Sequence, residues 1–573
     1  MEKAAAGTVK KSFVKGAIIL GIAGIICKII GAVYRIPLAN IIGERGMAHY
    51  QVAYPIYTLL LVVSSAGLPI AISKMVAEKI AVGDHFGAHR IYRVSAWLLA
   101  IVGVLTSVAM MIFAVPIAKA VGLETAWLAI LAIGPSLLIV SLISAFRGYF
   151  QGMQVMTPTA VSQIIEQVGK LAIGFPLALA FFAIGIAGPW GFLPEGVQNT
   201  AQNLANYGQA QFGAAGALLG VTGSELFALL LLFGIYLVAR PRLKRRIMAS
   251  VKLKKEKTFG IVGRIAKIAI PVTIGASIMP LVQLIDTAMV MNLVKDMPAI
   301  GSYSDQMFGV LTGFINPLIN VPAVLTIALM MALVPAISSS MVEKDMLAIR
   351  NKASTGLKLT MIIGFPCAAG FYLLSRPILE LLYGRLNNTL LPTGTAMDLA
   401  TQLLQVLAIG IFFLSIVQTM TGVLQGIGRV VIPVINLLIG AAVKVVLTLV
   451  LVGDPAINIV GAAYSTIACY AVAAILNIIF VIKQTRLRFR VLDFIIKPAL
   501  AAAGMGALVY FGQKLLEGPV GAKVSTVIAI VAGAIVYFML ILLFGALKPE
   551  DMAFMPGGAK LSRLMNKIGI WRK

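Results

Sequence analysis

Long runs of apolar residues, separated by short polar segments, dominate this 573-residue chain. Fourteen of these runs reach the ~20 apolar residues that an α-helix needs to cross a bilayer. They are centred near residues 27, 64, 104, 137, 170, 225, 279, 322, 365, 412, 441, 469, 502 and 535. The pattern therefore predicts an all-α polytopic membrane protein with about 14 transmembrane helices.

Composition supports a membrane protein, because 60% of the residues are hydrophobic and only 12% are charged. The first apolar run is too long for the core of a cleavable signal peptide and lacks a convincing cleavage site, so we expect a retained helix. The three cysteines, Cys27, Cys367 and Cys469, fall within predicted helices. Their spacing suggests neither a disulfide nor a metal site, and we expect them to be small packing residues.

The chain has 47 Lys and Arg residues and a net charge of +26, and its cations are unevenly distributed between the two predicted membrane sides. The side that holds the N-terminus carries 36 of them. The other side carries seven, namely Arg45, Lys119, Lys295, Arg376, Arg385, Lys514 and Lys523. The positive-inside rule then predicts that both termini are cytoplasmic. The basic block at 240–257 is accordingly interpreted as facing anionic membrane lipid, and no nucleic-acid partner is expected.

Two segments recur along the chain. Ala-Ile-Ser at 71–73 and Glu-Lys at 78–79 recur at 336–338 and 343–344, a constant offset of 265. Gly148, Gln-Gly at 151–152 and Lys170 recur as Gly422, 425–426 and Lys444, a constant offset of 274. Both copies run in the same direction relative to the membrane, so the repeat indicates a duplicated six-helix bundle followed by two additional helices.

This repeat predicts five parts. They are an N-terminal six-helix bundle (1–239), a basic cytoplasmic linker (240–258), a C-terminal six-helix bundle (259–482), helices 13 and 14 (483–547) and a basic cytoplasmic tail (548–573). Two similar bundles can rock against each other and expose a central site to each side of the membrane in turn. Alternating access is therefore the expected mode of transport.

Four cations, Lys28, Arg35, Lys170 and Lys444, lie in the middle of predicted membrane helices. A charge at this depth costs about 2.5 to 3.5 kcal/mol on insertion scales, so the four should face a shared polar interior. An interior lined with fixed positive charge favours an anion, such as a phosphate or a carboxylate. We therefore predict a cationic substrate-binding cavity made by these residues.

Several charged residues have an alternative role that the sequence leaves open. Arg147 and Lys74 lie near cytoplasmic helix ends, where they can contribute to substrate entry or simply extend their charge toward the interface. Glu166 and Lys170 have i,i+4 spacing and can neutralise each other instead of binding substrate. Lys444 can contact substrate or pair with Asp286, the deep acid of the seventh predicted helix.

The local sequence and the six, six and two arrangement of helices resemble the multidrug, oligosaccharidyl-lipid and polysaccharide (MOP) exporter superfamily. The segments 28–37 (KIIGAVYRIP) and 66–69 (AGLP) are similar to its polysaccharide-transporter branch, and particularly to the stage V sporulation protein B group. That group is related to MurJ-type lipid II flippases. The resemblance implies two six-helix bundles in a V shape. It also implies movement of a polyprenyl-diphosphate-linked sugar, such as lipid II, across the cytoplasmic membrane, with helices 13 and 14 forming a groove for the lipid tail.

The resemblance also implies a coupling ion. MurJ-type flippases carry a sodium site on helices 7, 11 and 12, and the matching candidates here are Asp286, Asn436 and Thr466. An acid that the family pattern places one turn after Asn436 is Gly440 in this chain. Either Na⁺ or H⁺ can serve as the coupling ion, and no other cofactor is expected.

Catalysis is not expected, since the 21 acidic residues are scattered and form no constellation typical of an active site. The His85 and His89 pair has i,i+4 spacing, but no nearby Cys supports a zinc site. A cation-coupled multidrug exporter of the same superfamily is the main alternative function. It would favour acids in the cavity over basic residues.

Overall fold

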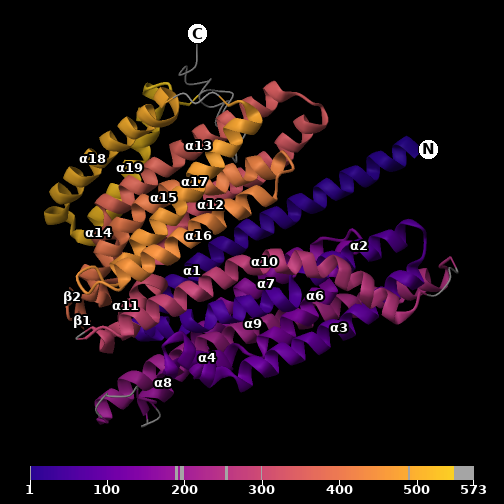
Figure 1. The fold of residues 1–573 in the computed structure, drawn as a ribbon, viewed down its shortest axis with the longest axis horizontal. Helices are drawn as coiled ribbons and strands as arrows, with labels where there is room; N and C mark the ends of the chain where they lie inside the picture. Colours follow the sequence, from indigo (N-terminus) through magenta and orange to yellow (C-terminus); the bar gives the residue numbers. More distant parts are fainter. Residues whose placement is uncertain are drawn as a thin grey trace. The chain divides into compact units, whose positions relative to one another are not determined.

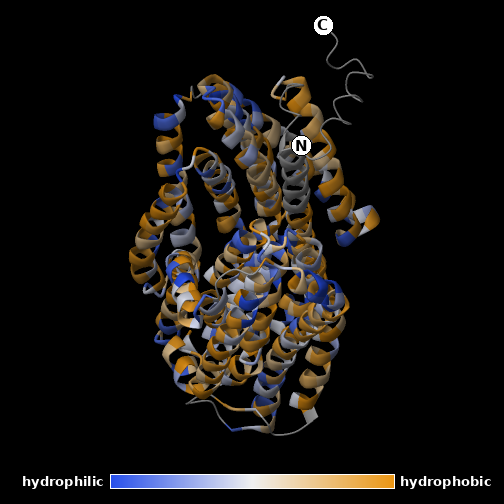
Figure 2. Ribbon diagram, turned by 90° about the vertical axis from the view of Figure 1, so that its right-hand side faces the viewer, coloured by the Kyte–Doolittle hydropathy of each residue, from blue (hydrophilic) through white to orange (hydrophobic). Residues whose placement is uncertain are grey.

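The computed structural model describes residues 2–187, 191–193, 199–251, 256–298, 300–487 and 491–547. The predicted tail at 548–573 and part of the predicted linker, 252–255, lie outside these ranges. The chain is almost entirely helical (Figure 1). Hydrophobic residues predominate along its long helices (Figure 2).

The first ten α-helices are α1 (Glu2–Ser65), α2 (Gly67–Ala81), α3 (His85–Ile112), α4 (Ala114–Val121), α5 (Trp127–Ile133), α6 (Ser136–Gly152), α7 (Thr157–Gly169), α8 (Phe175–Ala187), α9 (Ala201–Met248) and α10 (Thr258–Lys295). The remaining α-helices of the described ranges are α11 (Ser304–Gly309), α12 (Asn316–Val342), α13 (Met346–Leu373), α14 (Ser375–Tyr383), α15 (Ala396–Gly426), α16 (Val431–Val452), α17 (Val460–Thr485), α18 (Lys497–Val520) and α19 (Ala522–Leu543). Short 3-10 turns cover Glu124–Ala126, Gly301–Tyr303 and Gly384–Asn388, and π-helical segments cover Lys170–Gly174, Val310–Ile315 and Leu492–Ile496. Two short strands, β1 (Leu390–Leu391) and β2 (Gly394–Thr395), pair antiparallel, with Leu390 opposite Thr395.

Thirteen helical stretches of the described ranges are long and apolar enough to cross a membrane. Each of the 14 predicted centres falls within one of them, and the first stretch, Ile19–Ala81, contains two. That stretch is interrupted within α1 at Gly43, whose φ of 72° and ψ of −173° are not helical. Glycine tolerates this backbone conformation because it has no Cβ, so the chain can change direction here without an intervening loop. The expectation of an all-α polytopic membrane protein is confirmed.

Residue contacts divide the chain into two compact units. Unit 1 comprises Met1–Lys295 and Ser304–Gly313, and unit 2 comprises Asp296–Tyr303 and Phe314–Lys573. The seventh predicted helix, α10, packs in unit 1 on α1 and α2. The backbone N–H of Gly67 donates to the Thr273 hydroxyl at 3.2 Å, and Asn292 donates to the Ala120 carbonyl at 3.2 Å. The division at 240–258 stays a prediction drawn from the sequence repeat.

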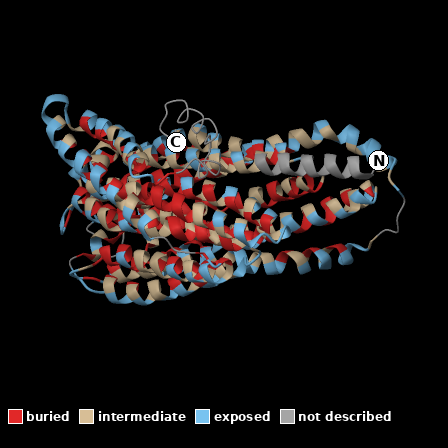
Figure 3. Cartoon of the chain, turned by 90° about the horizontal axis from the view of Figure 1, so that it is seen from above, coloured by how far each residue is buried: buried red, intermediate tan, exposed pale blue. Residues whose placement is uncertain are grey.

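Unit 1 is built around α9, which packs against α1, α7 and α8. Its apolar core joins buried residues of α2, α3, α6, α9 and α10. Glycines bring the helices close together: a Cβ on Gly220 of α9 would lie 2.2 Å from Cα of Gly174. Small residues at such positions are typical of helix pairs within membranes, where association depends on close packing. Buried residues are concentrated where the helices pack together (Figure 3).

Unit 2 contains α12 to α19, with α15 packed against α12, α13 and α17. The C-terminal hairpin of α18 and α19 packs on α13 through α18. Its Tyr537 hydroxyl donates to the Ile362 carbonyl of α13 at 2.8 Å, which satisfies a polar group in an apolar layer. The role of this hairpin as a tail groove stays a prediction.

The two sequence repeats make equivalent helix contacts in the two units. In unit 1, α6 packs on α2, and a Cβ on Gly148 would lie 3.0 Å from the Ile72 side chain. In unit 2, α15 packs on α12, and a Cβ on Gly426 would lie 2.9 Å from the Ile337 side chain. Ile337 is the repeat counterpart of Ile72, whereas Gly426 corresponds to Gly152 and not to Gly148. The two copies therefore share the packing of corresponding helices but not each residue contact.

Candidate substrate site in unit 1

Lys170, Glu166 and Arg147 form a three-residue ion network inside unit 1. The Glu166 carboxylate lies 3.3 Å from the Lys170 ammonium and 3.3 Å from the Arg147 guanidinium. All three side chains are less than one-fifth exposed. Arg147 also donates to the Ser162 hydroxyl at 3.0 Å. The i,i+4 pairing of Glu166 with Lys170, one of the two roles left open by the sequence, is therefore present, and Arg147 extends it.

The backbone at Lys170 departs from a regular α-helix. Residues Lys170–Gly174 form a π-helical turn between α7 and α8. Such turns contain an additional residue, which re-aims the side chains that follow, and they are frequent at functional sites. A Cβ on Gly174 would lie 2.8 Å from the Tyr34 hydroxyl oxygen. The turn thus allows close contact with α1, whose Tyr34 ring packs against Phe175 with centroids 5.0 Å apart.

Arg35 lies beside a row of tyrosines on the second half of α1. Its guanidinium carbon lies 5.6 Å from the centroid of the Tyr54 ring, which is within the range of a cation–π interaction. Tyr54 in turn stacks on Tyr50 with centroids 5.8 Å apart and contacts Tyr57 at 5.9 Å. The kink at Gly43 folds the two halves of α1 so that Arg35 and Tyr54 meet.

Glu225 of α9 is a buried acid that the sequence pattern did not single out. It is 2% exposed, and its carboxylate accepts hydrogen bonds from the Tyr57 hydroxyl at 2.8 Å and from the Ser136 hydroxyl. A buried carboxylate is costly unless such donors satisfy it. A single acid within the long apolar segment of α9 is a sequence signal that could have identified it.

These residues form one group, which we call the polar cluster of unit 1. Its members are Arg35, Tyr50, Tyr54, Tyr57, Arg147, Glu166, Lys170 and Glu225. Lys170 interacts electrostatically with Glu166, Tyr54, Glu225 and Tyr50, which connects the ion network to the tyrosine row. The three cations of the cluster outnumber its two acids.

Lys28 and Lys74 are not part of this cluster. Both side chains are exposed, and among the described residues neither forms an ion pair. Lys28 is two helical turns before Arg35 on α1, as the spacing predicts, but Arg35 is half-buried and Lys28 is not. Their roles in substrate binding or entry stay predictions.

The remaining predicted residues are divided between the units. Asp286 lies half-buried on α10 in unit 1, whereas Lys444, Asn436 and Thr466 lie in unit 2. Asn436 of α16 is buried and donates to the Asn477 side chain of α17 at 2.8 Å. The Thr466 hydroxyl donates to the Ala462 carbonyl of its own helix at 2.7 Å. The coupling-ion site stays a prediction, and Asn477 is a partner that the sequence did not reveal.

The structure explains why Gly440 replaces the acid of the family pattern. A Cβ at this position would lie 2.5 Å from the Cys469 carbonyl oxygen of α17. The backbones of α16 and α17 approach too closely here for any side chain. The space that an acid would need is filled by the neighbouring helix.

The membrane spans, the helical architecture and the buried polar cluster define the class of protein: a polytopic membrane protein built like a transporter. The chain belongs to the family described as "Lipid II flippase MurJ", whose sequence model matches residues 123–532. A second model, "Polysaccharide biosynthesis protein", matches residues 13–193. The resemblance to the MOP superfamily is thereby confirmed.

Individual relatives agree with this family. "Stage V sporulation protein B" of Bacillus subtilis (strain 168) is 26% identical and aligns over 96% of this chain and 98% of its own length. "Lipid II flippase MurJ" of the same organism is 26% identical over 91% of this chain and 94% of its own. Among solved structures, "Lipid II flippase MurJ, inward closed conformation" matches with a TM-score of 0.63 at 16% identity, covering 92% of this chain and 98% of that one.

A multidrug transporter has a related fold. The inward-facing conformation of a multidrug resistance MATE family transporter of the MOP superfamily matches with a TM-score of 0.58 at 14% identity. It covers 80% of this chain and 94% of that chain. At this identity, the likeness establishes a common fold only.

Proposed function

We propose that this protein is a flippase that moves a polyprenyl-diphosphate-linked sugar, lipid II or a related cell-envelope precursor, across the cytoplasmic membrane. The observation that carries the proposal is the polar cluster of unit 1, in a chain that belongs to the MurJ family. Three cations are held there within a membrane-spanning unit. Such charges are expensive in a membrane and are typical of substrate pathways.

The cluster suits the chemistry of a diphosphate. Arg35 can present a guanidinium with paired N–H donors, the geometry that favours bidentate contact with phosphate oxygens. The neighbouring rings of Tyr50 and Tyr54 offer flat surfaces of the kind on which sugars pack and hydroxyls that can hydrogen-bond to them. Lys170 and Arg147 are already bound to Glu166, so they contribute longer-range positive potential rather than free donors.

This division of roles makes Arg35 the principal phosphate ligand of the cluster. Lys28 lies on the same helix and can receive the phosphate before Arg35 does. A rocking motion between two bundles would then expose the cluster alternately to each side of the membrane. The distribution of Lys and Arg supports a cytoplasmic location for both termini.

The direct test is translocation in proteoliposomes. Purified protein is reconstituted with fluorescent lipid II or with a shorter polyprenyl diphosphate sugar, and the fraction of label protected from an impermeant reductant is followed with time. We expect the protein to accelerate exchange of at least one of these lipids over protein-free vesicles. Exchange no faster than in protein-free vesicles for both lipids would reject the proposal.

A multidrug exporter is the second candidate, and one observation favours it. The cluster contains two acids, the partly buried Glu166 and the buried Glu225, and acids in a cavity suit cationic drugs. Both carboxylates are occupied, however, by cations or by hydroxyl donors. Drug export predicts uptake of a fluorescent organic cation against its gradient in the same vesicles, with no exchange of the diphosphate lipids.

A further inference from the structure

A cavity of about 770 Å³ lies in unit 2, outside the sites predicted from the sequence. It is bounded by α14, the turn Gly384–Asn388, the end of α18 and the start of α19. The first two elements connect the predicted spans centred near 365 and 412, whereas α18 and α19 follow both repeats. These segments are far apart in sequence, but they are brought together because α14 packs on α19.

The cavity is lined by an excess of positive charge. Four cations line it, Arg376, Arg385, Lys514 and Lys523, against the two acids Glu380 and Glu517. Arg376 pairs with Glu380 at 2.9 Å and with Asp398 at 3.0 Å. Glu517 accepts from Gln513 at 3.2 Å and also interacts electrostatically with Lys514.

The two lysines are the most available cations of the cavity. The Lys514 ammonium lies 4.7 Å from the centroid of the Tyr510 ring, and Lys523 is exposed at the start of α19. Neither lysine forms an ion pair in the part of the chain that the structure describes. Two ammonium groups, each with three donors, therefore border the cavity and can bind an anion.

The predicted membrane orientation places the four cations of the cavity on the side that has few Lys and Arg residues. Only seven Lys and Arg residues are predicted on the outer side, and four of them line this one cavity. The other three are paired in unit 1. Arg45 lies 3.3 Å from Asp305, while Lys119 and Lys295 each lie 3.9 Å from Glu124. More than half of the Lys and Arg residues predicted on this side therefore line one cavity.

An apolar surface adjoins the cationic edge. Phe511 and Leu515, one turn apart on α18, are 69% and 78% exposed. Val524 follows Lys523 on α19 and is 53% exposed. In a membrane protein such residues face acyl chains, whereas the lysines beside them reach the level of the headgroups. The chemistry of the site is therefore that of a phosphate attached to an apolar tail.

We infer that this cavity binds the phosphate headgroup of an anionic membrane lipid in the outer leaflet, through Lys514 and Lys523. The acyl chains lie along Phe511 and Leu515, and Arg376 is held at the cavity wall by Glu380 and Asp398. Basic pockets between membrane helices on the matrix or cytoplasmic side bind anionic lipid headgroups, and the same chemistry is proposed here for the outer side. None of the residues that line the cavity belongs to the polar cluster of unit 1, although the hairpin of α18 and α19 is also the predicted groove for the substrate's lipid tail.

The test uses titration calorimetry to measure binding of a soluble short-chain phosphatidylglycerol to the purified full chain in a neutral detergent. Short-chain phosphatidylcholine and inorganic phosphate are measured in parallel. We expect binding of phosphatidylglycerol that is about tenfold weaker in the Lys514→Gln, Lys523→Gln variant. The Lys514→Arg, Lys523→Arg variant, which keeps the charge, should bind as the wild type does.

A matched control removes two other lysines predicted on the same side. Lys119→Gln, Lys295→Gln lowers the net charge equally but leaves the cavity intact, so binding should be unchanged. Equal weakening in this control, or none in the Lys514, Lys523 variant, would overturn the site. Phosphatidylcholine binding as tightly as phosphatidylglycerol would overturn the role of charge. Inorganic phosphate binding as tightly as the lipid would overturn the assignment to a lipid.

Discussion

The Glu166 carboxylate forms ion pairs with two cations, each at 3.3 Å: Lys170, one turn further along the same helical segment, and Arg147 of the preceding helix. One acid therefore holds two cations in a region that the membrane surrounds. The two basic residues are fixed by this acid rather than available to substrate, so the positive charge of the site is pre-organised. This arrangement predicts unequal effects of removing each partner.

Replacing Glu166 with Gln should destabilise the protein more than replacing Lys170 with Met. The first change leaves two adjacent, largely buried cations without a counter-charge, and breaking a fully buried pair costs about 3 to 5 kcal/mol, which sets an upper limit here. The second leaves Glu166 still paired with Arg147. The midpoint of thermal unfolding in detergent measures both. A Lys170→Met variant less stable than Glu166→Gln would contradict the shared-acid arrangement.

Glu225 should depend on its shape as an acceptor more than on its charge. In Glu225→Gln, the amide oxygen can still accept from Tyr57, and we expect a small change in thermal stability. In Glu225→Leu, the Tyr57 and Ser136 hydroxyls lose their acceptor, which costs about 1 to 3 kcal/mol for a buried group. If both variants unfold at the wild-type temperature, the hydrogen-bond network has no structural role.

Gly220 should tolerate no side chain. Its Cβ would lie 2.2 Å from Cα of Gly174, so Gly220→Ala should separate α9 from the π-helical turn and cost about 1 to 3 kcal/mol. A Cβ on Gly234 of the same helix would have no atom within 4 Å, which makes Gly234→Ala the matched control. Equal thermal stability of the two alanine variants would contradict the close packing of these helices.

Substitution of Asp286 tests the prediction of a coupling-ion site. If this carboxylate binds Na⁺ or H⁺ during transport, Asp286→Asn should abolish the acceleration of exchange by a gradient of that ion. Exchange without a gradient should remain, because an amide has a similar size and keeps the polar character. The measurement is the exchange rate with and without each gradient. A full response to both gradients in Asp286→Asn would exclude this residue from coupling.

The helices could be predicted from sequence because each is a long apolar run. All 14 predicted centres fall within membrane-spanning stretches of the structure. The kink at Gly43 was not predicted, since the apolar pattern continues through it and only the backbone conformation interrupts the helix. The pairing of Glu166 with Lys170 followed from their spacing on one helix.

Contacts between helices were harder to predict from the sequence. Arg147 reaches Glu166 from α6, and Glu225 receives its donors from α1 and α6, so both depend on tertiary packing. The same reason applies to Asn477, which meets Asn436 across two helices. The outer cavity combines α14 with the hairpin of α18 and α19, and nothing in the local sequence of either segment indicates the other.

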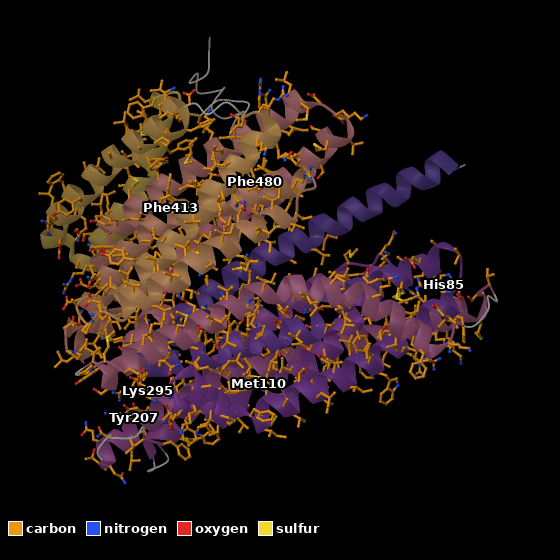
Figure 4. The ribbon with its side chains drawn as sticks, viewed as in Figure 1. His85, Met110, Tyr207, Lys295, Phe413 and Phe480 are labelled. Atoms are coloured by element: carbon orange, nitrogen blue, oxygen red, sulfur yellow. The ribbon has the colours of Figure 1, made fainter. Side chains whose placement is uncertain are left out.

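Residues at the two ends of unit 1 are predicted to lie on opposite sides of the membrane. Lys295 and Tyr207 lie at one end of this unit, and His85 lies at the other (Figure 4). The charge distribution assigns Lys295 to the outer side and His85 to the cytoplasmic side. Residues predicted on opposite membrane sides thus lie at opposite ends of unit 1, and which end faces the cytoplasm stays a prediction.

The central claim is that a diphosphate lipid is transported through contacts with basic residues of α1. The most direct measurement follows exchange of fluorescent lipid II and of the shorter polyprenyl diphosphate sugar. It compares the wild type with the double variant Lys28→Ala, Arg35→Ala and with a control double variant, Lys119→Gln, Lys295→Gln. Contacts between charged groups are worth about 1.5 to 3 kcal/mol each, so we expect the α1 variant to lose at least about tenfold in rate, whereas the control keeps the wild-type rate. Undiminished exchange in the α1 variant would contradict the claim.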